Sequence, residues 1–86
     1  MDKYEELIDL GQRLKKIRIA KGYSQEHLAS LANISSRYYG YVERGEKNIT
    51  YRSLLKILLA LDVEITEIFP CIKTIKRLIL RAKSAN

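Results

Sequence analysis

The chain is poor in the residues that build disulfides, metal sites and membrane spans. Its single cysteine, Cys71, can form neither an intramolecular disulfide nor a cysteine-based zinc site. Its single histidine, His27, has no cysteine partners and fits a surface position better than a metal site. The longest uninterrupted apolar stretch, Ile57–Leu61, is far shorter than the roughly 20 residues that a membrane span needs. We therefore expect no metal site and no membrane-spanning segment.

The sequence also lacks a recognisable catalytic arrangement. It has no credible Ser/His/Asp set, no catalytic pair of carboxylates and no glycine-rich phosphate loop. Glu43 and Glu46 lie near a predicted helix end, where structural or solvated roles fit them better than catalysis. No basic segment followed by an apolar stretch, as in a secretory signal, is visible. These absences predict a cytoplasmic protein that is not an enzyme and that uses no cofactor or small-molecule ligand.

Positive charge is in excess. Sixteen Lys and Arg residues against ten Asp and Glu residues give a formal net charge of +6 and a pI of about 9.6. A basic chain favours anionic partners, with nucleic acid ahead of acidic protein and anionic lipid. The 86 residues allow one domain, and a domain of this size buries only about 60% of the surface that its unfolded chain exposes. A partner subunit could supply a second buried surface.

Apolar residues recur with the period of a helix, and capping residues separate the periodic segments. Leu7, Leu10, Leu14 and Ile17 form the first stripe, which Gly22 ends. The sequence predicts further helices over Ser24–Ala32, Ser35–Arg44 and Thr50–Asp62, a short one from Thr66 to Phe69 before Pro70, and an amphipathic one from Ile72 to Lys83. No strand pattern competes, so the predicted fold is all-α, with five helices and an additional C-terminal helix.

Two of these helices, Ser24–Ala32 and Ser35–Arg44, form a predicted helix-turn-helix unit. Ala29 is the small residue needed where they cross, and Asn33 tolerates the left-handed conformation of a tight turn. The residues placed to anchor the unit to the core are Leu28, Ile34, Tyr39 and Val42. Gly40, inside the second helix, costs about 1 kcal/mol relative to Ala, which the close approach of another backbone would explain.

The segment Leu10–Phe69 resembles the phage-repressor-like Cro/C1 helix-turn-helix family, also called the XRE family. Three stretches carry the resemblance in order: LGQRLKKIRIAKGYSQEHLA, NISSRYYGYVERGEKNIT and LLKILLALDVEITEIF. The ERGEKNIT part is similar to restriction-modification controller proteins. The resemblance implies that the Ser35–Arg44 helix enters the major groove of double-stranded DNA while the preceding helix crosses the backbone. It also implies that Tyr39, where relatives are usually aliphatic, belongs to the core but is only partly buried.

The resemblance assigns roles to the polar residues of this unit. Arg37 is the leading base reader, because its planar guanidinium can donate two hydrogen bonds to guanine. The implied base-reading set is Ser36, Arg37, Tyr41 and Arg44. The implied phosphate-binding set, which lies near helix starts, is Gln25, Ser35, Asn48, Thr50, Arg52 and Ser53. Arg18 and Glu43 match a structural ion pair between the first and third helices, and for Tyr38 packing and DNA contact are both open.

The C-terminal segment has three interpretations: the edge of the core, a dimer interface, or a membrane-surface helix. A dimer interface through Ile72, Ile75 and Ile79 is favoured, because the segment carries more apolar surface than a core edge needs. Membrane contact is least favoured, because the helix is short and lacks Trp and Phe. We divide the chain into a DNA-binding domain, residues 1–70, and a C-terminal dimerisation helix, residues 71–86.

The predicted function is a sequence-specific, DNA-binding transcriptional regulator of the repressor type, acting as a homodimer on a roughly palindromic operator. The alternative is an antitoxin-like protein-interaction module whose C-terminal helix binds a partner protein.

Overall fold

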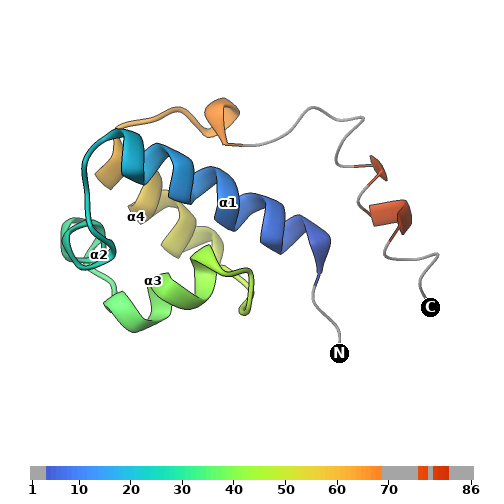
Figure 1. The fold of residues 1–86 in the computed structure, drawn as a ribbon, viewed down its shortest axis with the longest axis horizontal. Coiled ribbons are helices and arrows are strands. Elements are labelled where there is room, and N and C mark those ends of the chain that lie inside the picture. Colours follow the sequence, from blue (N-terminus) through green and yellow to red (C-terminus); the bar gives the residue numbers. More distant parts are fainter. Residues whose placement is uncertain (1–3, 69–75, 78, 82–86) are drawn as a thin grey trace.

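The computed structural model describes residues 4–68, 76, 77 and 79–81, and the first of these ranges forms four α-helices and a short 3-10 helix (Figure 1). The helices are α1 (Glu5–Ala20), α2 (Gln25–Ala32), α3 (Ser36–Glu43) and α4 (Tyr51–Leu61), followed by the 3-10 helix η1 (Ile65–Glu67). The described residues of the C-terminal segment are helical, and no described residue lies in a strand. The all-α prediction is confirmed.

Hydroxyl residues cap the starts of α2, α3 and α4, at the positions where the sequence predicts these helices to begin. In each case the side-chain oxygen accepts a hydrogen bond from the backbone amide three positions later, which would otherwise lack a partner. The donor and acceptor are 3.0 Å apart for the pairs Ser24 and His27, Ser35 and Tyr38, and Thr50 and Ser53. Each such cap contributes about 1 kcal/mol relative to Ala, so the starts of α2, α3 and α4 are fixed locally.

The ends of the helices are set by residues in the left-handed region. Gly22 and Gly45 follow α1 and α3 with φ of 81° and 70°. Asn33 and Asp62 cap α2 and α4, both with φ of 56°. Asn33 therefore makes the tight turn predicted between the two short helices.

The fifth element differs from the prediction. A helix was expected to begin at Thr66, whereas η1 begins one residue earlier, because the Glu67 carboxylate accepts a 2.7 Å hydrogen bond from the backbone amide of Glu64. This contact closes a single turn around Thr66. Phe69 and Pro70, which were expected to end the helix, lie outside the described residues.

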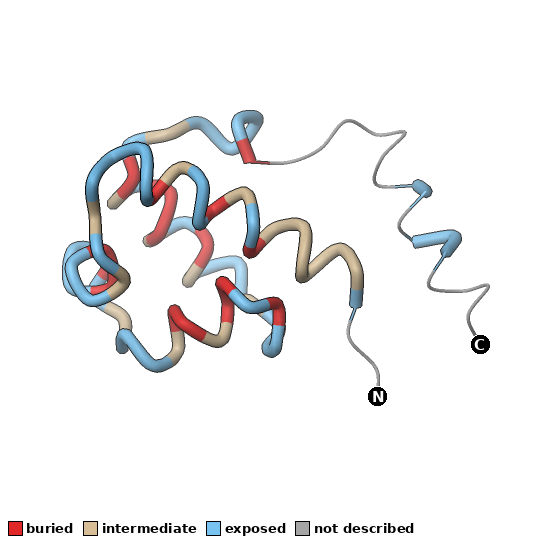
Figure 2. The backbone as a smooth tube through the Cα atoms, in the orientation of Figure 1, coloured by how far each residue is buried: buried red, intermediate tan, exposed pale blue. Residues whose placement is uncertain are grey.

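The core draws fully buried large side chains from each of the four α-helices and from Ile68, the residue that follows η1. In Figure 2 the buried positions recur along one side of each helix. The fully buried large residues are Leu14, Leu28, Tyr39, Ile57, Leu61 and Ile68. Tyr39 has no exposed surface, so the expectation that it would be only partly buried is wrong. Ala29, the small residue expected where the two helices cross, is 1% exposed and belongs to α2, which packs against both α3 and α4.

The close backbone approaches found in this fold lie at Gly11 and Gly45, not at Gly40. A Cβ atom added to Gly11 would lie 2.3 Å from the carbonyl oxygen of Glu43, so α1 and α3 are in direct backbone contact there. The explanation offered for Gly40 is wrong, because the atom nearest to an added Cβ is a guanidinium nitrogen of Arg44, 3.1 Å away. Gly45 also meets a backbone, since its added Cβ would lie 2.7 Å from the Cα atom of Ile8.

Candidate nucleic-acid interface

Helix α3 has one face inside the protein and one face outside. Its inner face buries Tyr39, Val42 and Glu43. Three of the four predicted base readers, Ser36, Arg37 and Arg44, are exposed, and the fourth, Tyr41, is half-buried. Tyr38 is also half-buried. The helix therefore presents the four side chains on the surface that the helix-turn-helix geometry leaves uncovered, while their role in reading bases stays a prediction.

The predicted phosphate-binding residues gather at the starts of α2, α3 and α4. Ser35, Asn48, Thr50 and Arg52 are exposed, whereas Gln25 and Ser53 are half-buried. The Thr50 hydroxyl, besides accepting from the Ser53 amide, donates to the Ser53 hydroxyl over 2.9 Å. Helix starts carry partial positive charge and free amides, which suit a phosphate. Phosphate binding at these residues stays a prediction.

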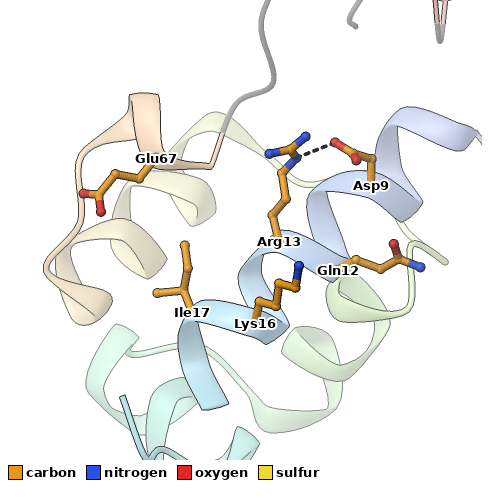
Figure 3. A pocket seen from close by; sticks show the side chains of 6 residues that line it. All are labelled: Asp9, Gln12, Arg13, Lys16, Ile17 and Glu67. Atoms are coloured by element: carbon orange, nitrogen blue, oxygen red, sulfur yellow. Dashed lines mark hydrogen bonds and ion pairs between the residues drawn. The ribbon is translucent and has the colours of Figure 1, made fainter. Parts of the chain in front are cut away.

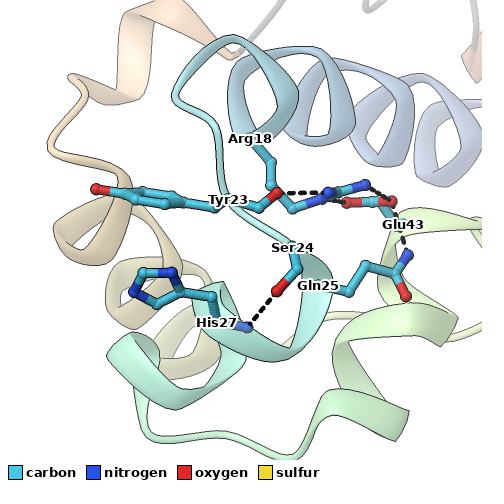
Figure 4. A network of polar contacts seen from close by, with 6 residues as sticks. All are labelled: Arg18, Tyr23, Ser24, Gln25, His27 and Glu43. Carbon is cyan, nitrogen blue, oxygen red and sulfur yellow. Dashed lines mark hydrogen bonds and ion pairs between the residues drawn. The ribbon is translucent and has the colours of Figure 1, made fainter.

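A buried polar network joins α1, the loop after it and α2 to α3 (Figure 4). Arg18 of α1 donates to both carboxylate oxygens of Glu43, from Nε over 2.7 Å and from Nη2 over 3.1 Å. Its Nη1 donates to the backbone carbonyl of Tyr23 over 2.7 Å. The side chains of Arg18 and Glu43 are 10% and 3% exposed. The ion pair expected between these two residues is therefore present. Its two parallel hydrogen bonds fix the guanidinium plane against the carboxylate plane.

Gln25 belongs to the same network, which the sequence did not indicate. Its Nε2 donates to Oε1 of Glu43 over 2.9 Å. The side chain predicted to touch phosphate is thus oriented by the carboxylate that α1 holds in place. The network links α1, the loop after it, α2 and α3 through four side-chain hydrogen bonds.

The electrostatics of the network follow from burial and pairing. Burial alone would raise the pKa of Glu43, but hydrogen bonds, chiefly from Arg18, outweigh it and lower the pKa below its ordinary value. The same pairing raises the pKa of Arg18. Burial, with the nearby Glu43 carboxylate, raises the pKa of Tyr39, whose hydroxyl oxygen is buried without a hydrogen-bonding partner among the described residues. At neutral pH the pair is therefore ionised and Tyr39 is neutral.

Positive charge surrounds one tyrosine at the far end of α3. The Nζ atom of Lys47 lies 4.6 Å from the centroid of the Tyr41 ring, and the Cζ atoms of Arg44 and Arg37 lie 5.2 Å and 5.9 Å from it. Arg44 also donates from Nε to Glu46 over 3.0 Å. Lys47 was not among the predicted site residues, because the sequence of a loop does not show which side chains of the preceding helix the loop contacts.

Among the described residues, the remaining surface offers little that resembles a second site. A shallow pocket between α1 and η1 is lined by mixed charges and one apolar side chain, from Asp9, Gln12, Arg13, Lys16, Ile17 and Glu67 (Figure 3). Asp9 and Arg13 pair with each other there, at 2.8 Å. Over the described ranges, no three His, Cys, Asp or Glu residues are grouped as a metal site would require. None of the helices in those ranges combines the length and apolarity needed to cross a membrane.

Comparison with known proteins places this geometry among regulators. A family model described as helix-turn-helix matches residues 14–68, which include α2, α3 and α4. The chain is similar to control protein C.MunI of Mycoplasma sp, with 35% identity over 63 residues that cover 72% of this chain and 85% of that protein. It is also similar to control protein C.SmaI of Serratia marcescens, with 30% identity over 69% of this chain and 70% of that protein.

Solved structures agree with these sequence matches. The restriction-modification controller protein C.AhdI from Aeromonas hydrophila superposes with a TM-score of 0.75 and 47% identity, covering 77% of this chain and all of that one. The controller protein C.Esp1396I, solved as a tetramer in complex with its natural 35 base-pair operator, superposes with a TM-score of 0.68 and 32% identity. That match covers 88% of this chain and 92% of the other.

Proposed function

The chain belongs to the helix-turn-helix family of the Cro/C1 (XRE) type, and on that basis we propose that it is a transcriptional regulator that binds a roughly palindromic operator as a homodimer. The observation that carries the proposal is the division of α3 into two faces. Its inner face is fixed to α1 by the Arg18–Glu43 pair, and its outer face presents Arg37 and its neighbours to solvent. The relatives named above support the restriction-modification controller type, and we place its action in the cytoplasm.

In the proposed complex, α3 lies in the major groove and α2 crosses the sugar–phosphate backbone. Arg37, in the first turn of α3, donates two hydrogen bonds to a guanine, a contact worth about 1–3 kcal/mol of discrimination. Ser36, Tyr41 and Arg44 complete the outer face. Because Glu43 is held on the opposite face by Arg18, the direction in which these side chains project is set before DNA is bound.

Phosphate contacts would fix the register of the complex. We assign them to the helix starts and the loop before α4, through Gln25, Ser35, Asn48, Thr50, Arg52 and Ser53. The hydrogen bond from Gln25 to Glu43 supports this, since it holds the amide group at the start of α2. These contacts carry no sequence information and should act on all DNA alike.

Dimerisation is proposed through the C-terminal element, residues 71–86, attached to the DNA-binding domain of residues 1–70. Ile79 is 44% exposed, which leaves it available for a partner, and Ile72 and Ile75 lie outside the described residues. Helix α4 adds exposed apolar surface at Leu55 and Leu59, which are 37% and 81% exposed. Two copies related by a two-fold axis would read half-sites about 34–36 Å apart.

The experiment that tests the proposal is selection of bound fragments from a random DNA pool, followed by binding assays on the selected duplex and its single-position variants. Arg37→Ala should lose preference at one base position in each half-site while retaining binding to mixed-sequence DNA. Arg13→Ala removes the same charge from α1, outside the interface, and should keep the preference. A wild-type protein that selects no sequence would refute the proposal, and an unchanged preference in Arg37→Ala would refute the assignment of the base reader.

Salt dependence separates this function from the antitoxin-like alternative. Binding that neutralises phosphates weakens steeply as salt rises, with a slope of about −0.9 per phosphate contact in a plot of log affinity against log salt concentration. A protein whose main task is to bind another protein through its C-terminal helix should bind DNA weakly and without half-site symmetry.

A further inference from the structure

Arg37, Arg44 and Lys47 converge on the ring of Tyr41, and we call these four residues the tyrosine–cation cluster. All three cations lie within the roughly 6 Å of the ring centroid over which the negative face of an aromatic ring attracts positive charge. Arg37, Tyr41 and Arg44 follow each other at spacings of four and three, so they share one face of α3. Lys47 joins them from the loop that follows the turn at Gly45.

The hydrogen bonds of the cluster orient the cations and, among the described residues, pair only one of them, Arg44, with an acidic group. The Nε atom of Arg37 donates to the Tyr41 hydroxyl in a long contact of 3.4 Å. Arg44 donates to Glu46 over 3.0 Å. Since that carboxylate is the one acidic group bonded to the cluster among the described contacts, the cluster keeps a net positive charge. Like charges repel when they are brought together, so the ring is the element that compensates for their proximity.

Gly40 supplies the space for one of the three cations. A Cβ atom at this position would lie 3.1 Å from Nη1 and 3.7 Å from Nη2 of Arg44. The guanidinium thus packs directly against residue 40, where a methyl group would press on it, close to the ring of the next residue. The glycine and the tyrosine act together: one leaves room for Arg44 on the helix surface, and the other attracts it there.

We infer that Tyr41 is a positioning residue, which holds Arg37, Arg44 and Lys47 in a DNA-binding arrangement before DNA arrives, with Gly40 making room for Arg44. The inference rests on the proposed function and revises the expectations that Tyr41 and Arg44 read bases. Arg37, in the first turn, faces the base edges; Arg44 and Lys47, at the end of α3 and beyond it, face the phosphates. Long cationic side chains lose much rotamer freedom on binding, and orienting them beforehand reduces that cost.

A double-mutant cycle on the duplex selected as above distinguishes positioning from direct contact. Tyr41→Leu should weaken binding about fivefold, because the cations are released although all are still present. Lys47→Ala should weaken binding about tenfold in the wild-type background but only about twofold in the Tyr41→Leu background, since Lys47 is then already free. Tyr41→Phe keeps the ring and should bind within about twofold of wild type. Tyr4→Leu, the same change at an exposed tyrosine outside the cluster, should have no effect.

A spectroscopic readout on the free protein makes the test independent of DNA. Protons above an aromatic ring are shifted upfield, so the side-chain proton resonances of Lys47 should be shifted upfield in wild type and Tyr41→Phe, and should return to ordinary positions in Tyr41→Leu. Normal Lys47 shifts in wild type, or additive effects of Tyr41→Leu and Lys47→Ala on DNA affinity, would overturn the inference. Failure of the wild type to bind any DNA would instead refute the proposed function.

Discussion

Replacing Gly11 by Ala tests the backbone contact between α1 and α3. In an isolated helix this change would add about 1 kcal/mol of stability, since Ala has the higher helix propensity. In this fold the new Cβ would lie 2.3 Å from the carbonyl oxygen of Glu43 and 2.7 Å from that of Val42. Neither atom can move without its helix, so α1 and α3 must separate by about 1 Å to reach ordinary contact distances.

The expected cost exceeds the gain in propensity. Overpacking typically costs about 1–3 kcal/mol, and here the separation also stretches the Arg18–Glu43 pair, whose complete loss would cost about 3–5 kcal/mol. We expect a net destabilisation of about 2 kcal/mol, against a total stability on the order of 5–10 kcal/mol for a domain of this size. The thermal midpoint should then fall by about 10–15 °C.

Gly40→Ala provides the matched control, since it makes the same change in another helix. Its new Cβ meets the flexible side-chain ends of Arg44 and Gln25, 3.1 Å and 3.7 Å away, so Gly40→Ala should raise the free energy of unfolding by up to about 1 kcal/mol. Urea denaturation followed by circular dichroism measures both variants. If Gly11→Ala is as stable as wild type or more stable, the backbone contact does not constrain the packing of α1 and the reasoning is wrong.

Three further predictions follow from the network and the turns. Glu43→Gln should be about 3 kcal/mol less stable than wild type at neutral pH. The difference should shrink as the pH falls through the lowered pKa of Glu43, because protonation of the carboxylate removes the stabilisation that its ionised form provides. Denaturation across acidic pH measures this, and a difference that stays constant would contradict it. Asn33→Ala should lower stability by about 1 kcal/mol while Asn33→Gly should be nearly neutral, as thermal melting can show. Gln25→Ala should weaken binding to operator and mixed-sequence DNA alike and lower stability by about 1 kcal/mol, so a loss confined to the operator would count against its phosphate role.

The parts of the fold that were predicted correctly depend on interactions a few residues long. Ser24, Ser35 and Thr50 cap helices through contacts to amides three positions away, so their sequence neighbours suffice to identify them. Asn33 and Asp62 end helices because of the backbone conformations open to them.

The parts that were missed depend on contacts between elements. Gly40 stood out in the sequence because it interrupts a helix, yet the backbone approach is made by Gly11, which lies on the buried stripe between Leu7 and Leu14. The sequence did contain a sign of this approach, because a glycine on the apolar face of a long helix lowers helix propensity without an evident local reason. No sequence pattern indicated the contact of Lys47 with Tyr41, since this contact depends on how the chain turns after Gly45.

The two-faced construction of α3 has a consequence for redesign. Residues 36 and 37 can be exchanged in combination to seek new operators, since both are exposed and neither supports the core. The same helix cannot be grafted by itself onto a foreign scaffold. Glu43 would then be buried as an anion without Arg18, the cation that pairs with it here. A successful transplant has to carry Arg18, and with it the glycine at 11 that lets the two helices meet.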